Sequence, residues 1–430
     1  MAPFQRFMSS QKRSTARRLF SALWVTVTAL AVTALSSYAS YDTYHFWVRL
    51  DAVPMGLLCL VSYLTMVLVL RRLIRFPTVE AVGLLLLVVG IFASIVYLLV
   101  SVTRVYYSNT FIFTFFGTAF LLLWIWVNLR QGSPNLHLHV VPGGVTHELL
   151  QIPGLQNQVD IAILDTPDPE VLTDHAHGII VDMAERREDE WVRFFSHCTL
   201  HGIEIYPAEE VFEAFTGRVS LVHLSEGVIE AFNVSPVYQM IKRVEGILFV
   251  LVSLPISLPL MILTAAAIRL DSPGPIVFTQ NRVGQGGRAF RMHKFRSMAH
   301  TTGDHEAKFA DTKDDRITKV GAFIRKFRLD ELPQFWNILV GDMSLIGPRP
   351  EQVGFVERFE TEIPYYAYRH LVKPGITGWA QVNHGYAADH EETRTKLEHD
   401  LYYVKHFSFW LDVLITFKTV KTIVTGFGAR

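Results

Sequence analysis

RKFRLDELPQFWNILVGDMSLIGPRP, residues 325–350, is the stretch around which this chain is organised. It places two adjacent carboxylates, Asp330 and Glu331, between cationic side chains on both sides. A helical pattern resumes over Glu331–Leu339, so we predict that Asp330 caps the N-terminus of a helix, where backbone N–H groups and the helix dipole favour an anion. Adjacent residues of a helix point in different directions, so one carboxylate can face a phosphorus atom while the other binds a metal ion or a proton.

The cations around this carboxylate pair suit a phosphate ligand. Arg325, Lys326 and Arg328 precede the pair, and Arg349 follows it. Together they would hold a diphosphate electrostatically while a carboxylate attacks phosphorus. The alternative is that Asp-Glu-Leu-Pro only begins a well-capped surface helix.

The composition indicates a membrane protein with room for two or three domains. The chain has 430 residues, of which 50% are hydrophobic and 19% charged, and its mean hydropathy is +0.26. An ordinary soluble enzyme is less apolar. Its 40 basic and 40 acidic residues balance, which argues against a general polyanion binder and therefore against a nucleic-acid partner. Two cysteines, Cys59 and Cys198, support neither a disulfide framework nor a zinc site.

Residues 1–134 are predicted to form a bundle of four transmembrane helices. A basic segment precedes the first apolar run, which is too long for the apolar core of a signal peptide and is interpreted as a retained anchor. Arg71, Arg72 and Arg75 mark the loop after the second run as cytoplasmic, which places both ends of the bundle on the cytoplasmic side. The four runs, each close to the roughly 20 residues that a spanning helix needs, are Leu19–Tyr41, Ala52–Leu70, Val79–Val102 and Asn109–Leu129.

Residues 135–235 are predicted to form a small Rossmann-like α/β domain with a parallel sheet. Short apolar strands alternate with helical segments, of which Glu188–His201 is the clearest. VPGGVTHELL after the first strand lacks a complete G-x-G-x-x-G fingerprint, so dinucleotide binding is not favoured. The histidines of this domain match no standard metal-ligand spacing, and a regulatory, scaffolding or oligomerisation role fits best. The expected strands are Leu138–Val141, Val159–Leu164, Gly178–Val181 and Ile203–Tyr206.

A second membrane element opens the remaining part of the chain, residues 236–430. The apolar stretch Gly246–Ile268 is long enough to span a bilayer. However, Pro255 and Pro259 interrupt it, and basic residues flank both of its ends. We therefore predict a bent, re-entrant helix at about residues 242–269 that enters and leaves on the same face, with a fifth span as the alternative.

The segments beyond this helix supply further candidate residues. IVFTQNRVGQGGRAFRMHKFRSM predicts a β-hairpin around Gly284–Gly287, and its second arm leads to Lys294 and Arg296, which would project toward a lipid phosphate at the membrane surface. Aromatic and basic residues mix over His399–Val424, which favours helices lying on the bilayer, with a core helix as the alternative.

Several ordered motifs in this part of the chain resemble one known family. LDELPQFWN and GDMSLIGPRP, with HKFRSM upstream and KPGITGWAQVN downstream, closely resemble the bacterial sugar transferases, which are monotopic phosphoglycosyl transferases or polyprenyl-phosphate hexose-1-phosphate transferases. The resemblance begins at about Lys242 and implies an α/β monotopic catalytic domain whose proline-broken helix enters one leaflet. Leu258 replaces the serine of the family's Ser-Pro break, so Ser253 or Ser257 would have to satisfy the freed carbonyls. His384 also stands where the family usually has glycine.

This resemblance implies a covalent mechanism. Asp330 would attack the β-phosphorus of a UDP-sugar, release UMP and carry a phosphosugar until a polyprenyl (undecaprenyl) phosphate accepts it. Glu331 would bind Mg²⁺ or assist acid–base chemistry, and the diphosphate itself calls for magnesium. The phosphate or uridine would be held by Lys294, Arg296, Arg325, Arg328 and Arg349.

The layout resembles family members that initiate exopolysaccharide or capsule synthesis at the bacterial cytoplasmic (inner) membrane, with the catalytic domain on the cytoplasmic face. UDP-glucose is the expected donor, and UDP-galactose and a UDP-N-acetylhexosamine are the alternatives. A homo-oligomer could form through the bundle or the α/β domain. A non-catalytic membrane scaffold and a small transporter are the competing classes. The intact acidic pair argues against the first, and the absence of carboxylates from the membrane interior of the four predicted spans argues against the second.

Overall fold

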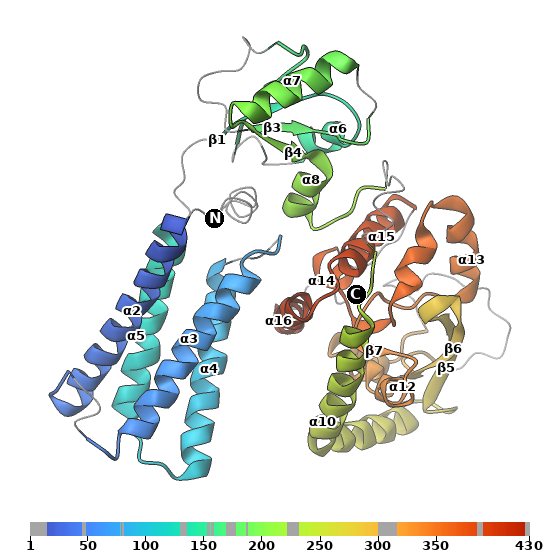
Figure 1. Cartoon of the computed structure of the whole chain (residues 1–430). Helices are drawn as coiled ribbons and strands as arrows, with labels where there is room; N and C mark the ends of the chain where they lie inside the picture. The colour runs from blue at the N-terminus through green and yellow to red at the C-terminus, as the bar shows by residue number, and fades with distance from the viewer. Residues whose placement is uncertain are drawn as a thin grey trace. The chain divides into compact units, whose positions relative to one another are not determined.

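The computed structural model forms two compact units, Met1–Gly217 and Arg218–Arg430. Figure 1 shows the order of the elements along the chain. The basic residues Arg6, Lys12 and Arg13 before the first predicted span lie outside the described residues. The structure describes Val79, Leu155 and residues 15–44, 49–77, 81–129, 136–152, 159–168, 178–185, 188–221, 232–299, 316–384 and 390–425.

The first unit begins with a helical bundle that confirms the four apolar runs. Every helix is long and apolar enough to cross a bilayer. Inside the bundle, the Tyr63 hydroxyl donates to Thr28 Oγ1 at 2.7 Å, whereas Leu86 and Phe113 are 64% and 74% exposed. Apolar side chains on the outer faces of long helices need a lipid environment. The helices are α2 (Thr15–Tyr41), α3 (Val53–Leu73), α4 (Ala81–Thr103) and α5 (Asn109–Leu129).

A four-stranded sheet follows, and it confirms the predicted α/β domain. All of its strand pairs are parallel, and the strand order is β2-β1-β3-β4. Side chains alternate between two cores: Ile180 packs with α6 and α8 on one face, while Ile179 packs with α7 on the other. The elements are β1 (Leu136–Val140), α6 (Val145–Leu150), β2 (Val159–Ile163), β3 (Gly178–Val181), α7 (Asp189–Leu200), β4 (Glu204–Pro207) and α8 (Ala208–Thr216).

A carboxylate of this domain fills the position after β1 where a Rossmann fold usually takes a phosphate. Asp182, 1% exposed at the end of β3, accepts hydrogen bonds from Val145 N and Ala184 N, both at 2.9 Å. Gly144 precedes α6 with φ +54°, and a Cβ atom there would lie 1.8 Å from Asp182 Oδ2. A dinucleotide phosphate would have to displace this side chain, which agrees with the incomplete glycine fingerprint.

We expect Asp182→Ala to destabilise the α/β domain by about 1–3 kcal/mol, because the buried Val145 N–H and the partly buried Ala184 N–H lose their acceptor. Hydrogen exchange of the full-length protein, followed by mass spectrometry, should show faster exchange over residues 136–221. Asp165→Ala is the control, since Asp165 is an exposed aspartate beyond β2 in the same domain. Equal exchange in the two variants would contradict the structural role of Asp182.

The second unit begins with α10 (Pro236–Asp271), a 36-residue helix that contains Pro255 and Pro259. A straight helix of this length would measure about 54 Å, but α10 turns sharply partway along (Figure 1). Val250 in its first arm packs against Ile338 and Met343, and Ile268 in its second arm packs in another cluster of the same unit. Both arms therefore pack on one compact domain.

The two serines expected to satisfy the carbonyls freed by the prolines do not do so. Pro255 and Pro259 lack the N–H groups that would bond to Leu251 O and Pro255 O. Ser253 Oγ instead donates to Val250 O at 2.9 Å, and the buried Ser257 hydroxyl has no partner among the described residues. The expectation for these serines was wrong, because Ser253 donates to the carbonyl before Leu251 and Ser257 donates to none of the described carbonyls.

The rest of the second unit surrounds two short sheets. The predicted hairpin is confirmed: β5 (Val277–Val283) pairs antiparallel with β6 (Ala289–Phe295) across η3 (Gln285–Gly287). A second sheet joins β7 (Ser344–Ile346) to β8 (Gly375–Thr377) in parallel. The remaining elements are α11 (Lys319–Lys326), η4 (Leu329–Glu331), α12 (Gln334–Val340), α13 (Val353–Glu362), η5 (Tyr366–Leu371), α14 (Trp379–Asn383), α15 (His390–Lys405) and α16 (Phe409–Thr425).

The glycines of KPGITGW bring two stretches of backbone together. A Cβ atom on Gly375 would lie 2.1 Å from Gly347 N, and one on Gly378 would lie 2.2 Å from Gly347 O. These two glycines are therefore needed where, within the described residues, backbone lies directly against backbone. Gly385, beyond His384, lies outside those residues.

Several apolar side chains of the C-terminal segment pack inside the protein, which supports the alternative of core helices, whereas Phe409 is 47% exposed. Tyr402, Tyr403 and Leu411 are 4%, 1% and 0% exposed. Asp412, on α16, pairs with Lys242 Nζ of α10, which also donates to the Tyr403 hydroxyl at 2.6 Å. These contacts require α15 and α16 to be core helices, and they anchor the first arm of the membrane helix.

Candidate functional site

Asp330 and Glu331 lie in η4, a 3₁₀ turn between α11 and α12. Arg328 precedes this turn in the left-handed region, with φ +55°. The helix itself begins at Gln334, and its N-cap is Pro333. The prediction that Asp330 caps the helix was therefore wrong. Pro333 has no backbone N–H, so it suits the start of a helix, where that group has no partner within the helix.

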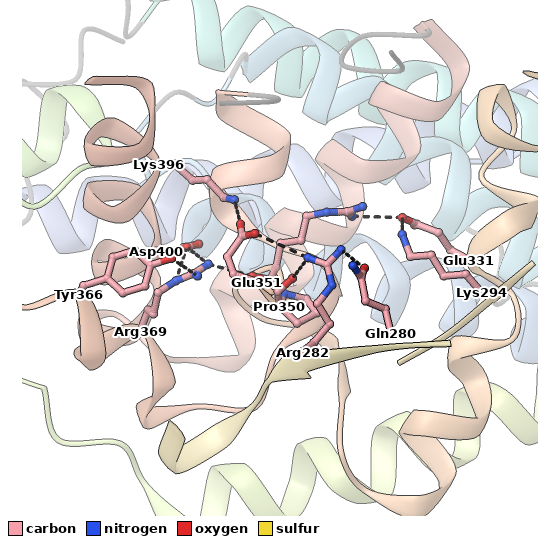
Figure 2. Close-up of polar contacts among 11 residues, drawn as sticks. Gln280, Arg282, Lys294, Glu331, Pro350, Glu351, Tyr366, Arg369, Lys396 and Asp400 are labelled. Carbon is pink, nitrogen blue, oxygen red and sulfur yellow. Dashed lines mark hydrogen bonds and ion pairs between the residues drawn. The ribbon is translucent and has the colours of Figure 1, made fainter. Parts of the chain in front are cut away.

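Glu331 is buried at the centre of a cluster of cations. Its Oε1 lies 3.1 Å from Arg349 Nη1 and 3.6 Å from Lys294 Nζ, and its Oε2 lies 3.4 Å from Arg328 Nη1. Figure 2 shows Lys294 pointing at this carboxylate. Burial alone would raise the pKa of Glu331, but the three cations together lower it to about 2. Glu331 is therefore ionised throughout the physiological range.

The Asp330 carboxylate is less buried than that of Glu331, and it is not paired with the neighbouring cations. Burial, and then the negative charge of Glu331, raise the pKa of Asp330, although Lys294, Arg349 and Arg325 oppose this shift. No hydrogen bond or ion pair joins the Asp330 carboxylate to another of the described residues. It is thus an available anion beside a group of positive charges, the arrangement that a nucleophile aimed at a diphosphate requires.

Two of the predicted phosphate-binding arginines lie outside this cluster. The Arg325 guanidinium acts on Asp330 at longer range, and its buried Nη1 has no partner among the described residues. Arg296 is 7% exposed and donates to Ser272 O at 2.7 Å and to Pro273 O at 2.8 Å. The structure thus uses Arg296 to hold the loop that leaves α10, whereas Lys294, two residues earlier, reaches Glu331.

Asn337 is a buried residue of LDELPQFWN whose role was not predicted. Its side chain joins α12 to β6, because Nδ2 donates to Arg291 O at 2.7 Å and Oδ1 accepts from His293 N at 3.1 Å. Asn337 is 0% exposed. Lys294 follows directly on β6, so this amide fixes the strand that carries one of the cations. A polar amide next to the apolar residues Trp336 and Ile338 was the signal in the sequence.

The acidic pair can contribute to a magnesium site but cannot form one alone. Among the described residues, no three histidine, cysteine or acidic side chains gather in a way that could hold a metal ion. Glu331 is ionised, as a Mg²⁺ ligand must be, and Mg²⁺ commonly takes one or two carboxylates together with phosphate oxygens and water. The residues therefore fit a metal ion that shares Glu331 with a bound diphosphate, in competition with the three cations.

Comparison with known proteins places this arrangement among sugar transferases. Residues 237–426 match the family described as bacterial sugar transferase. UDP-N-acetylgalactosamine-undecaprenyl-phosphate N-acetylgalactosaminephosphotransferase of Aeromonas hydrophila is 45% identical over 393 residues, which cover 90% of each chain.

Two further relatives match less than half of this chain. UDP-glucose:undecaprenyl-phosphate glucose-1-phosphate transferase of Escherichia coli (strain K12) is 43% identical over 188 residues, which are 43% of this chain and 40% of the relative. The protein with the same description from Xanthomonas campestris pv. campestris is 39% identical over 212 residues, which are 48% and 43% of the two chains.

Proposed function

Because this chain belongs to the bacterial sugar transferase family and is an enzyme that transfers a sugar phosphate, we propose that it moves a sugar 1-phosphate from a UDP-sugar to undecaprenyl phosphate. The observation that carries the proposal is the Asp330 carboxylate, which is not engaged by any described residue and lies beside the cations gathered on Glu331. The relatives named above act on undecaprenyl phosphate and a UDP-sugar according to their descriptions.

In the first step, an oxygen of Asp330 attacks the β-phosphorus of the donor. A bond forms between this oxygen and phosphorus, the bond from phosphorus to the bridging oxygen breaks, and UMP leaves with the bridging oxygen and its electron pair. In the second step, a phosphate oxygen of undecaprenyl phosphate attacks the same phosphorus and releases the Asp330 carboxylate. The product is an undecaprenyl-diphosphate sugar, and Asp330 returns to its starting state.

Arg349, Lys294 and Arg328 stabilise the charge that develops on the phosphate oxygens. Glu331 holds these three side chains together at 3.1–3.6 Å. Because its pKa is lowered to about 2, we assign Glu331 to electrostatic positioning rather than to proton transfer. A bound Mg²⁺ would neutralise the diphosphate further.

The rate of UMP release should fall as the pH drops through the raised pKa of Asp330, because only the ionised carboxylate attacks phosphorus. This acid limb should lie above the pH range in which an ordinary aspartate titrates. Glu331→Gln removes a negative neighbour that raises this pKa, so the limb should move to lower pH in the variant. Single-turnover measurements on both proteins test this, since the donor titrates identically in each. A limb at the same or a higher pH in the variant would contradict the assignment.

We further propose that α10 enters and leaves the membrane on the cytoplasmic face of the bacterial inner membrane. The packing of both arms on one domain supports this topology, as does the cytoplasmic location of UDP-sugars. Cysteines introduced singly at exposed positions of α13 and of the α3–α4 loop should be labelled from the same side in right-side-out vesicles. Labelling from opposite sides would require α10 to span the bilayer.

The donor is proposed to be UDP-N-acetylgalactosamine, because the relative that covers 90% of both chains acts on that sugar by its description. UDP-glucose, the donor expected from the layout, is the second candidate, because the two relatives described as glucose-1-phosphate transferases match 43% and 48% of this chain at 43% and 39% identity. Lipid-linked product measured with UDP-N-acetylgalactosamine, UDP-N-acetylglucosamine, UDP-galactose and UDP-glucose distinguishes them. Oligomerisation and the role of residues 135–235 remain predictions.

A further inference from the structure

The loop that carries Arg349 is held at four consecutive backbone carbonyls. Residues 348–351 form this loop between β7 and α13, and each of their carbonyl oxygens accepts a hydrogen bond from a separate donor. Two donors are backbone N–H groups and two are arginine side chains. The contacts are Gly375 N to Pro348 O at 3.0 Å, Arg369 Nη2 to Arg349 O at 2.9 Å, Arg282 Nη1 to Pro350 O at 3.1 Å, and Val283 N to Glu351 O at 2.9 Å.

The first of these arginines, Arg369, is itself fixed on all sides. It is 2% exposed, and its Nη2 and Nε donate to Asp400 Oδ2 at 2.7 and 3.2 Å. Its Nη1 donates to the Tyr366 hydroxyl at 2.9 Å. Figure 2 shows Arg369 between Tyr366 and Asp400. One guanidinium therefore ties α15 and η5 to the backbone of Arg349.

The second arginine, Arg282, is held from the opposite direction, on β5. Its Nη2 donates to Gln280 Oε1 at 2.7 Å, and its Nη1 lies 3.7 Å from Glu351 Oε2. Glu351 also pairs with Lys396. Burial alone would raise the pKa of Glu351, but Lys396, Arg369 and Arg282 lower it to about 2. Glu351 is therefore ionised across the physiological pH range.

We propose that Arg369 and Arg282 are positioning residues for Arg349. By holding the carbonyls of Arg349 and Pro350, they keep the Arg349 guanidinium 3.1 Å from Glu331 and facing the donor diphosphate. The inference rests on the proposed function, which assigns Arg349 to that diphosphate. Small displacements of a group that stabilises developing charge are costly, with a misplacement of about 1 Å lowering rates by roughly 100-fold.

Arginine is needed at both positions because one planar guanidinium must donate to a backbone carbonyl and to a side-chain oxygen, Asp400 Oδ2 for Arg369 and Gln280 Oε1 for Arg282, in fixed directions. Arg369 Nη2 contacts both Arg349 O and Asp400 Oδ2. A lysine ammonium keeps the charge but does not reproduce this fork. Arg369→Lys and Arg282→Lys therefore change the geometry of the loop while leaving the net charge of the network unaltered.

A double-mutant cycle with Arg349→Ala tests the proposal in the full-length enzyme, reconstituted in nanodiscs. Arg369→Lys and Arg282→Lys should each lower kcat for UMP release by about 10- to 100-fold. Because they act through Arg349, neither should cause a further loss in the Arg349→Ala background. Arg358→Lys is the matched control, since Arg358 forms an exposed pair with Glu362 at 2.7 Å on α13, and it should leave kcat unchanged.

The outcomes separate this proposal from the proposed function. Suppose that Arg349→Ala lowers the rate, and that each lysine variant lowers it by the same factor in the Arg349→Ala background as in the original protein. The two arginines then act through general stability, so the positioning inference is overturned while the proposed function stands. If Arg349→Ala keeps the original rate, the assignment of Arg349 fails and the positioning inference fails with it. Thermal unfolding of each variant is measured in parallel. If Arg369→Lys does not fold, the same cycle is measured with Arg282→Lys, because the Arg282 side chain is less buried, at 16% exposed. A loss of kcat that adds to the loss caused by Arg349→Ala overturns the inference.

Discussion

Asp330→Asn lowers transfer of sugar phosphate to undecaprenyl phosphate by roughly 10⁴-fold or more, because an amide oxygen does not replace a carboxylate nucleophile. The substitution keeps the size of the side chain, and no described residue forms a hydrogen bond or ion pair with the carboxylate that it removes. The thermal unfolding temperature should therefore stay close to that of the original protein.

Two measurements check this result. Labelled lipid product reports the overall reaction, and intact-protein mass spectrometry after incubation with donor alone reports a phosphosugar adduct, which the original protein should carry at Asp330 and the variant should lack. Glu362→Gln, an exposed carboxylate paired with Arg358, controls for the loss of one negative charge. Retained transfer by Asp330→Asn, or an adduct at another residue, would refute the nucleophile assignment.

Glu331→Ala should reduce kcat/KM by about 100- to 1,000-fold, because three cations lose the anion that gathers them. Lys294, Arg328 and Arg349 would then repel one another in a partly buried site. Breaking buried ion pairs by removing one partner also costs about 3–5 kcal/mol of stability, so the unfolding temperature should fall together with activity.

The comparison with Glu331→Gln separates the two effects. Glutamine keeps an acceptor oxygen for Arg349 but lacks the charge, so stability should recover in part while kcat/KM stays low. Steady-state kinetics and thermal unfolding, measured on the same preparations, give both quantities. Activity of Glu331→Ala close to that of the original protein would show that the cation cluster needs no central carboxylate.

The sequence was most informative where a periodic pattern extends over a whole element. The four apolar runs predicted α2–α5, because a helix in lipid needs a long continuous apolar segment. The alternation of short apolar strands with helical segments predicted the parallel sheet, because burial repeats along each element at the spacing of its secondary structure. Glu331 and the cations on either side of it were identified for the same local reason, since they lie within a few residues or in one motif.

Contacts between distant side chains and backbone were not predictable in this way. Arg296 and Lys294 look alike in HKFRSM, yet one holds the loop after α10 and the other reaches Glu331. Arg369 and Arg282 lie outside the acidic motif, and their partners are carbonyl oxygens, which every residue possesses. The burial of Tyr403 depends on Asp412 and Lys242, which are 9 and 161 residues away from it.

The bend of α10 concerns a segment that is synthesised before the residues against which it packs. Residues 236–271 leave the ribosome before Phe295, Ile324, Ile338 and Met343, the side chains that later receive its two arms. During that interval the most apolar part of the C-terminal unit has no protein surface to pack against, and it is long enough to be inserted as an ordinary span. Pro255 and Pro259, together with the basic residues Lys242, Arg243 and Arg269 that flank the apolar stretch, are then the features that oppose a straight crossing. In the proposed topology, they must therefore direct the nascent helix back before the domain that will hold it exists.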